Sequence, residues 1–282
     1  MSDKKFKHDP TEENADFDVF AMTLLFDEKV GLPEQNEVEE AASRHLGQNK
    51  VFTGNGENVG VACLDRTVET GKGTMPVLLM MSACFENDDK MITDFDRAQL
   101  WDCPDHERIL SECMYAFTAI DSFGGGLLST ERAQLEIDWL ATLLDLFPQC
   151  RAVYFANSGK LMETDRLREM INDSDKELFP YMAVNVRYFS TGEPDGELLI
   201  DTLGMAILGL PDIQYRFKGR NPSDIVCHAY NMACHLLYHD CPVMDGDTVG
   251  GFNANGEPVN WVCRYETAFV EPPREVISIN VG

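Results

Sequence analysis

The order of strand-like and helix-like segments along the chain restricts the fold more than any other feature of this sequence. Short apolar runs, such as those at 58–64 and 77–84, follow one another with only turn residues between them, and single helical patterns interrupt the groups. Strict alternation of strand and helix, which builds wholly parallel sheets, is absent. The sequence therefore predicts an α+β fold in which mixed or mainly antiparallel sheets carry helices packed on their faces.

Three long helices are predicted. The segment 34–46 is followed by Gly47, at the place where a left-handed residue commonly closes a helix. The segment 129–147 carries apolar residues at helical spacing and is expected to pack inside the protein. The third long helix covers 223–239, and shorter helices are predicted from Pro104 and over 163–171.

The other ordered segments are predicted to be strands. The first, 17–26, is apolar on both faces, as in a central strand that is covered on both sides. Turn residues at 192–196 and at Asn255-Gly256 predict two hairpins. The remaining predicted strands are 114–121, 152–156, 182–190, 197–208, 213–217 and segments around Thr248, Val262 and Ile277.

A chain of 282 residues exceeds the usual size of one hydrophobic core, so two packed units are expected. We predict a disordered tail at 1–15, an N-terminal α+β half at 16–150 and a C-terminal α+β half at 151–282. No proline-, serine- or glycine-rich linker marks the boundary, so the halves are predicted either to pack closely or to form one continuous unit. The sequence leaves open whether they share one sheet, and it contains no evident internal repeat.

The chain is strongly acidic, with 48 acidic against 23 basic residues and a net charge of -25. Such a field repels nucleic-acid backbones and anionic lipid surfaces, so neither nucleic acid nor a membrane is expected as a partner. Two interpretations of the charge remain. It keeps a cytoplasmic protein soluble, or it forms a docking face for a basic protein.

The location is predicted from segments that the sequence lacks. No run of about 18 apolar residues could span a bilayer, and no apolar run follows the N-terminal lysines as in a secretory signal. The nine cysteines form no CxxC pair, and a disulfide framework is not expected. We therefore predict a cytoplasmic protein whose cysteines are mostly buried thiols.

Three consecutive motifs in the C-terminal third carry a family resemblance. They are DTLGMAILGLPDIQYRF, HAYNMACHLLYHD and DGDTVGGFNANGEPV. The stretch from about 183 to 281 resembles the bacterial domain-of-unknown-function family 4261, with a less specific likeness in the preceding region. The resemblance implies an acidic residue after the proline of Leu-Gly-Leu-Pro, a place that Asp212 occupies, whereas Gln214 departs from the longer acidic–apolar–acidic pattern. It implies a fold and no reaction.

A set of histidines on the helix at 223–239 is the strongest candidate for chemistry. His228, His235 and His239 share one helical face, and stacked imidazoles can bind a divalent metal. Asp240, Asp245 and Asp247 follow closely, and Cys227, Cys234 and Cys241 lie on an adjacent stripe. The alternative is an amphipathic helix whose histidines are hydrogen-bonded at the edge of the core. Leu236 stands where the general base of an HExxH metalloprotease would be, which excludes that class.

Other catalytic or ligand-binding signatures are incomplete. The glycine run 124–126 lies between a strand and a helix, where amides can bind phosphate, but it lacks the lysine of a Walker loop. Gly54-x-Gly56 is followed by a strand rather than by the helix that a dinucleotide site needs. Trp261 could line a pocket or pack in the core.

Two hypotheses of function follow. The first is a non-catalytic binding or regulatory module, similar in role to immunity proteins, that needs no cofactor. Its acidic surface would meet a basic partner, and Asp212, Asp245, Asp247 and Trp261 are candidate ligand or partner contacts. The second is a metal-dependent hydrolase whose metal would be held by His228, His235 and His239, with Asp240, Asp245 or Asp247 assisting.

Overall fold

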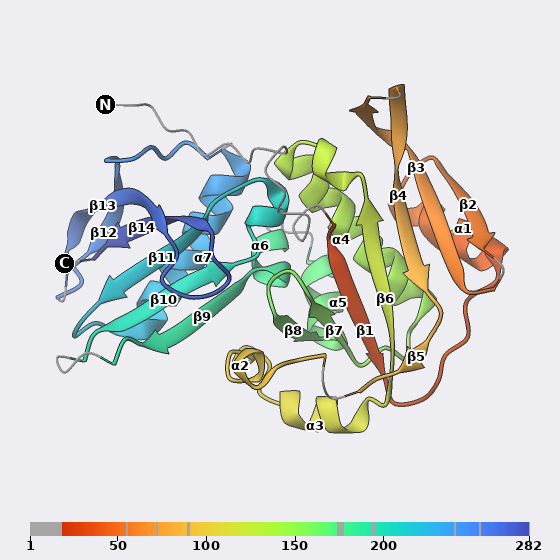
Figure 1. Cartoon of the computed structure of the whole chain (residues 1–282), viewed down its shortest axis with the longest axis horizontal. Coiled ribbons are helices and arrows are strands. Elements are labelled where there is room, and N and C mark those ends of the chain that lie inside the picture. The colour runs from red at the N-terminus through yellow and green to blue at the C-terminus, as the bar shows by residue number, and fades with distance from the viewer. Residues whose placement is uncertain are drawn as a thin grey trace. The chain divides into compact units, whose positions relative to one another are not determined.

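The computed structural model describes residues 19–54, 56–71, 73–88, 91–173, 178–192, 196–239, 241–253 and 255–281. The chain divides into two compact units, one ending at Ala183 and the other beginning at Val184. Each unit has its own sheet (Figure 1). Both sheets are mostly antiparallel and carry helices, so the α+β prediction is confirmed. The predicted tail at 1–15 lies outside the described residues.

The N-terminal unit is built on one large sheet. Its strands follow the order β2-β3-β4-β6-β1-β7-β8, and β5 pairs with β6. The strands are β1 (Ala21–Phe26), β2 (Asn49–Gly54), β3 (Asn58–Thr70), β4 (Gly73–Ser82), β5 (Phe85–Glu86), β6 (Tyr115–Ser122), β7 (Ala152–Phe155) and β8 (Lys160–Glu163). The helices are α1 (Gln35–His45), α2 (Asp94–Arg97), α3 (His106–Glu112), α4 (Ser129–Leu146), α5 (Thr164–Asn172) and α6 (Leu178–Ala183), with a 3-10 turn η1 (Gly124–Gly126) before α4.

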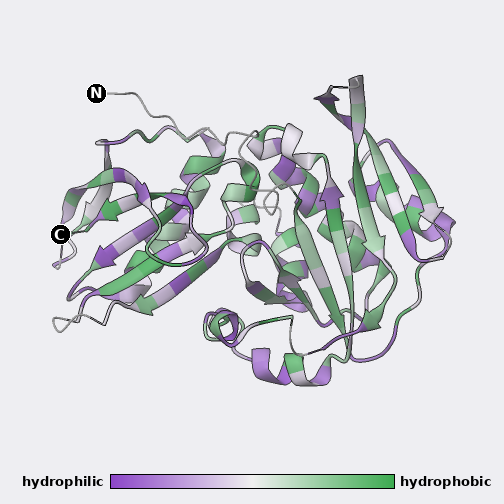
Figure 2. Cartoon of the chain, in the orientation of Figure 1, coloured by the Kyte–Doolittle hydropathy of each residue, from purple (hydrophilic) through white to green (hydrophobic). Residues whose placement is uncertain are grey.

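Two groups of helices cover this sheet. Helices α1 and α4 pack against each other, and Trp139 and Leu143 of α4 are fully buried. The segments around α2 and α3 contribute Ile92 and Ile109 to a hydrophobic cluster that also contains Leu25 of β1 and Ala116 of β6. The middle strands β1 and β6 are hydrophobic over most of their length (Figure 2), because both of their faces are largely covered.

The C-terminal unit holds a six-stranded sheet in the order β12-β13-β14-β11-β10-β9. All neighbouring strands are antiparallel except β11 and β14. The elements are β9 (Asn185–Ser190), β10 (Leu198–Leu203), the 3-10 turn η2 (Ala206–Leu208), β11 (Asp212–Phe217), α7 (Pro222–Tyr238), β12 (Thr248–Phe252), β13 (Pro258–Thr267) and β14 (Glu275–Asn280). Helix α7 packs on one face of this sheet.

The two units share a topology that the sequence does not reveal. In each, a strand is followed by a helix and a three-stranded antiparallel meander, β1-α1-β2-β3-β4 and β11-α7-β12-β13-β14. In the C-terminal unit the last meander strand, β14, pairs directly and in parallel with β11. In the N-terminal unit β6 lies between β4 and β1 and is antiparallel to both, so that β4 again runs parallel to β1.

The observed division of the chain differs from the predicted boundary near residue 150. Strand β7 pairs with β1, and β8 pairs with β7, so both strands belong to the first sheet. The chain changes sheets only at Ala183 and Val184. The reason is a long-range strand pairing, which leaves no local mark in the sequence.

Two predicted strands also have different bounds. The segment predicted as a strand at 182–190 begins inside helix α6 and becomes extended only at Asn185. The strand predicted at 197–208 ends at Leu203, because Gly204 adopts a φ of 129° and a 3-10 turn follows. Gly47, in contrast, has the predicted left-handed conformation after α1.

Crossing a bilayer takes a long apolar helix, and the described residues of this chain form none.

Candidate binding surface

Helix α7, the one α-helix in the described part of the C-terminal unit, covers one face of its sheet and leaves the other face without a helix of this unit. On β11, Tyr215 points to α7, because its hydroxyl lies 2.9 Å from Nδ1 of His228 on that helix. Side chains alternate between the faces of a strand, so Gln214 and Arg216 lie on the opposite face. We call this the open face.

The strand register aligns the side chains of the open face into rows. One row runs across β13, β14, β11, β10 and β9 and contains Val262, Asn280, Arg216, Leu199 and Phe189. The next row is polar in every position and contains Arg264, Ser278, Gln214, Asp201 and Arg187. A third row places Glu266 beside Val276 and Asp212.

The crossing loop, residues 268–274, joins β13 to β14 and passes over the open face. The amide of Phe269 donates to Oε1 of Gln214 at 3.1 Å, and Nη1 of Arg187 donates to the carbonyl of Glu271 at 2.8 Å. Arg274 donates to the carbonyls of Val270 and Pro272. The loop is therefore tied to β11 and to β9.

A buried ion-pair network holds the crossing loop from below. Nη2 of Arg274 lies 2.8 Å from Oδ2 of Asp201, and its Nε lies 3.0 Å from Oδ2 of Asp212. Arg187 pairs with Asp201 through two bonds of 2.9 and 2.6 Å. Although burial favours the neutral form, the two carboxylates raise the pKa of Arg274. Moving one member away from this network would leave a buried charge unpaired, which is strongly unfavourable. The network therefore holds the crossing loop firmly in place.

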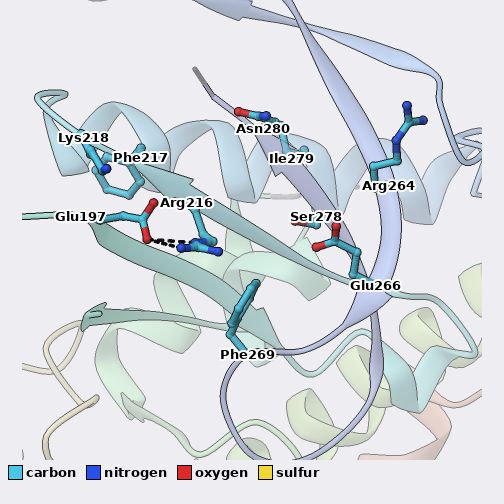
Figure 3. Close-up of a pocket in the computed structure, with 10 residues that line it drawn as sticks. All are labelled: Glu197, Arg216, Phe217, Lys218, Arg264, Glu266, Phe269, Ser278, Ile279 and Asn280. Atoms are coloured by element: carbon cyan, nitrogen blue, oxygen red, sulfur yellow. Dashed lines mark hydrogen bonds and ion pairs between the residues drawn. The ribbon is translucent and has the colours of Figure 1, made fainter. Parts of the chain in front are cut away.

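A hollow of about 490 Å³ opens on this face beside the crossing loop (Figure 3). Its walls come from the residue before β10, the end of β11, and strands β13 and β14, and Phe269 of the loop stands at its edge. The lining residues are Glu197, Arg216, Phe217, Lys218, Arg264, Glu266, Phe269, Ser278, Ile279 and Asn280.

Arg216 is fixed in place on one side of the hollow. Both Nε and Nη2 of its guanidinium donate to Oε2 of Glu197, the former at 3.0 Å. The same guanidinium lies 4.7 Å from the centre of the Phe269 ring. Arg216 nevertheless remains 43% exposed and Phe269 57% exposed. An exposed aromatic ring and an exposed arginine are thus held in one conformation.

The charged groups on β13 are held more loosely. Arg264 is 52% exposed, and its single ion pair, with Asp245, spans 4.0 Å. Glu266 is exposed, and its carboxylate makes no hydrogen bond or ion pair with any residue in the described part of the chain. Both groups are therefore available to a ligand.

Most of the C-terminal unit matches a known family of proteins. Residues 201–280 match the family described as Domain of unknown function (DUF4261). The predicted resemblance is therefore confirmed for this region. The DUF4261 match includes every residue that lines the hollow except Glu197. No curated protein and no solved structure gives a significant match to the chain.

The three predicted histidine ligands are not brought together in the DUF4261 region. His228 is hydrogen-bonded at both ring nitrogens, since Nε2 lies 2.8 Å from the carbonyl of Gly250 and Nδ1 lies 2.9 Å from the Tyr215 hydroxyl. Burial lowers the pKa of this imidazole. His235 and His239 are exposed, with ring centres 4.8 Å apart. No three or more His, Cys, Asp or Glu side chains in the described ranges are arranged to hold a metal, and Asp240 lies outside those ranges.

The other predicted contact residues have structural partners. Asp245 accepts a hydrogen bond from the amide of Tyr265, and Asp247 accepts one from the amide of Met244, so both stabilise the turn before β12. Trp261 is 2% exposed, packs 4.7 Å from the His228 ring, and does not line the hollow. Asp212 belongs to the buried network under the crossing loop.

Two buried ionisable groups of the N-terminal unit were missed by the sequence analysis. Glu136 of α4 is 0% exposed, and no N–H group of the described residues donates to its carboxyl oxygens, which lie beside the carboxylate of Asp121. Lys160 of β8 is also buried, 3.0 Å from Asp102 and 2.8 Å from the carbonyl of Tyr181, and burial lowers its pKa to about 8. The lysine links the loop after α2 to α6. No polar pattern in the sequence distinguishes these two residues from the exposed glutamates and lysines elsewhere in the chain.

Proposed function

We propose that the protein is a non-catalytic cytoplasmic binding and regulatory module, similar in role to immunity proteins, that binds a basic partner protein through the open face of its C-terminal sheet. One observation carries this proposal. The hollow on that face presents an exposed Phe269 and an exposed Arg216 that are already fixed against each other and against Glu197.

The composition of the hollow supports recognition of a protein. Aromatic residues and arginine are enriched in protein interfaces and dominate the binding energy of many of them. Arg216 and Phe269 need little ordering on binding, because the ion pair and the ring contact hold them beforehand. The surrounding charged groups, Arg264 and Glu266, would form a polar rim.

The charge of the chain supports a basic partner. A net charge of -25 attracts positively charged proteins over distances comparable to the Debye length and raises their association rate. The same field opposes binding to nucleic acid and to anionic membranes, so neither is included in the proposal.

The chemistry of the hollow supports a function without catalysis. Its lining contains no histidine and no cysteine, and Ser278 lies between Arg264 and Gln214, neither of which is a general base. In the N-terminal unit, burial raises the pKa of the Cys103 and Cys113 thiols to about 12. These two cysteines are therefore poor nucleophiles as well. The alternative of a metal-dependent hydrolase lacks the free His228 ring that it requires.

Capture experiments with a matched pair of variants test the proposal. Immobilised wild-type protein, Phe269→Ala and Phe85→Ala are exposed to a cell extract at about 0.05 M and about 0.5 M salt, and retained proteins are identified by mass spectrometry. Phe85 is an exposed phenylalanine of the N-terminal unit and serves as the control. We expect basic proteins that are retained at low salt by the wild type and by Phe85→Ala, and lost with Phe269→Ala. Retention of no protein at low salt, or equal retention by all three, would contradict the proposal.

A further inference from the structure

The order of free charges on β13 defines the kind of segment that the hollow can hold. We infer that it binds an extended segment of the partner in which an acidic and a basic side chain stand two residues apart. The inference rests on the proposed function and adds the sequence character of the partner's contact segment.

The spacing of Arg264 and Glu266 is the first observation. Both lie on the open face of β13 and both line the hollow, with one inward-facing residue between them. Alternate residues of a strand are about 6.6 Å apart along its axis. An extended peptide repeats its side chains at the same interval, so it can place one charge on Arg264 and the next on Glu266.

The availability of these two charges is the second observation. Arg216 and Glu197 neutralise each other through a two-point ion pair. Arg264 has one distant partner, Asp245, which is itself 47% exposed. The Glu266 carboxylate has no partner among the described residues. The two charged groups that β13 presents to the hollow are thus a cation and an anion, not two charges of one sign.

The neighbours of each charge suit its expected counterion. Ser278 lies directly across from Arg264 in the register, and its hydroxyl can donate to a carboxylate that pairs with the guanidinium. Glu266 is itself exposed and lines the hollow, so a lysine or arginine can bring its charged end to the carboxylate while its stem stays at the surface.

Segments with two charges of the same sign fit less well. A segment with two basic residues would bring a cation against Arg264, and one with two acidic residues would bring an anion against Glu266. Like charges placed together at an interface are unfavourable and reject wrong partners. A segment of mixed charge satisfies both groups at once.

Fluorescence anisotropy with labelled, blocked peptides tests the inference on the full chain at about 0.15 M salt. One peptide carries a glutamate and a lysine separated by one residue, a second carries them side by side, and others carry two lysines or two glutamates. We expect the spaced mixed peptide to bind most tightly. The side-by-side peptide should bind about two- to fivefold more weakly, because it directs its charges to opposite faces and loses one exposed ion pair.

Variants of the two charged residues provide the second readout. Arg264→Gln and Glu266→Gln should each weaken the spaced mixed peptide by about two- to fivefold. Glu275→Gln is the matched control, because Glu275 is an exposed glutamate on the adjacent strand that does not line the hollow. Arg264→Glu should reverse the preference, so that the peptide with two lysines binds more tightly than the mixed one.

The outcomes separate this inference from the proposed function. Binding of all peptides with equal affinity, or an effect of Glu275→Gln as large as that of Glu266→Gln, overturns the inference. If no peptide binds while Phe269→Ala still abolishes capture of a basic protein, the proposed function stands and the mixed-charge segment is wrong. If neither peptides nor proteins bind, both proposals fail.

Discussion

Glu136 is a buried carboxyl group whose environment opposes ionisation. Burial raises its pKa well above the ordinary value, and the charge of nearby Asp121 adds to this shift, while Arg132 acts against it. Asp121 itself is satisfied by Arg132, at 3.0 Å from both Nε and Nη2, and by the amide of Phe20 at 2.6 Å. Glu136 is therefore the member of this cluster that carries a proton.

This protonation makes stability depend on pH in a definite direction. In the unfolded chain a glutamate titrates near pH 4.3, at about its ordinary pKa, whereas folded Glu136 keeps its proton to higher pH. The stability that this bound proton contributes is fully present below the pKa of Glu136 in the unfolded chain. It is lost as the pH rises towards the higher pKa of Glu136 in the folded protein. Glu136→Gln removes this loss, so the variant should gain about 1.4 kcal/mol in unfolding free energy over the wild type for each pH unit in that window.

Thermal or urea unfolding from about pH 4.5 to about pH 8 measures the effect of Glu136→Gln. Glu40→Gln makes the same chemical change at an exposed position of α1 and should shift stability equally at every pH. A difference between Glu136→Gln and the wild type that does not vary with pH would show that the carboxyl ionises freely in the folded protein.

His228 illustrates what a sequence pattern can say about single residues. The helical spacing of His228, His235 and His239 correctly places the latter two rings together. It does not reveal that Tyr215 and Gly250 occupy both nitrogens of His228, because these partners come from β11 and β12. The alternative that the sequence left open, a histidine hydrogen-bonded at the edge of the core, describes this residue.

At the scale of elements, β12 depends on a glycine that lies under a tryptophan. A Cβ atom on Gly251 would stand 2.2 Å from the Trp261 ring, whereas one on the neighbouring Gly250 would meet nothing within 4 Å. Trp261 is packed between Phe252 and His228 and cannot move without disturbing both. The β12–β13 hairpin therefore requires glycine at position 251.

The two glycines form a matched pair for mutation. Gly251→Ala should lower the unfolding free energy by about 1–3 kcal/mol through overpacking, and it should change the fluorescence of Trp261. Gly250→Ala should change stability by no more than about 1 kcal/mol in either direction, since its side chain enters open space. Denaturant unfolding of both variants is the measurement. Equal effects of the two substitutions would mean that the ring shifts at little cost.

Most elements are predictable from the sequence because their signals are local. Gly47 closes α1 as expected, and Asn255-Gly256 lies in the turn between β12 and β13. Strands β2 and β8 were missed, since each is short and mixes polar with apolar residues. Their strand character comes from pairing with β3 and β7 rather than from their own composition.

The candidate site was not predictable for a related reason. Its side chains come from strands β11, β13 and β14, from the residue before β10 and from the crossing loop, and the long-range pairing of these strands brings Arg216, Arg264 and Glu197 around one hollow. The resemblance to the family pointed to Asp212, which lies beneath the crossing loop rather than in the hollow. The aspartate supports Phe269 indirectly through Arg274.

At the scale of the whole molecule, the strand–helix–meander order recurs in both units, but each unit completes its sheet differently. Strands β7 and β8 extend the first sheet beyond β1, and β10 and β9 extend the second beyond β11. Insertion of β6 between β4 and β1 makes the first sheet wider. The open face with its hollow belongs to the second sheet, and the DUF4261 match falls there.

The charge of -25 has two effects that salt should separate. Self-repulsion destabilises the compact state, and screening relieves it. Raising sodium chloride from about 0.01 M to about 0.1 M shortens the Debye length from about 30 Å to about 10 Å. The melting temperature should rise by roughly 2–4 °C, the shift that about 1 kcal/mol produces in a domain of 150–250 residues. Capture of a basic partner should weaken over the same range, because the same screening reduces attraction.

A variant of lower charge tests whether repulsion is the cause. Glu40→Lys reduces the net negative charge by two on the exposed face of α1, so it should raise the melting temperature at low salt and make its rise with salt smaller. A melting temperature that falls as salt is added would mean that surface ion pairs, such as those of Arg108 with Asp105 and Glu112, outweigh the repulsion. In that case the acidic residues stabilise the fold through local ion pairs, and repulsion within the net charge of -25 does not limit its stability.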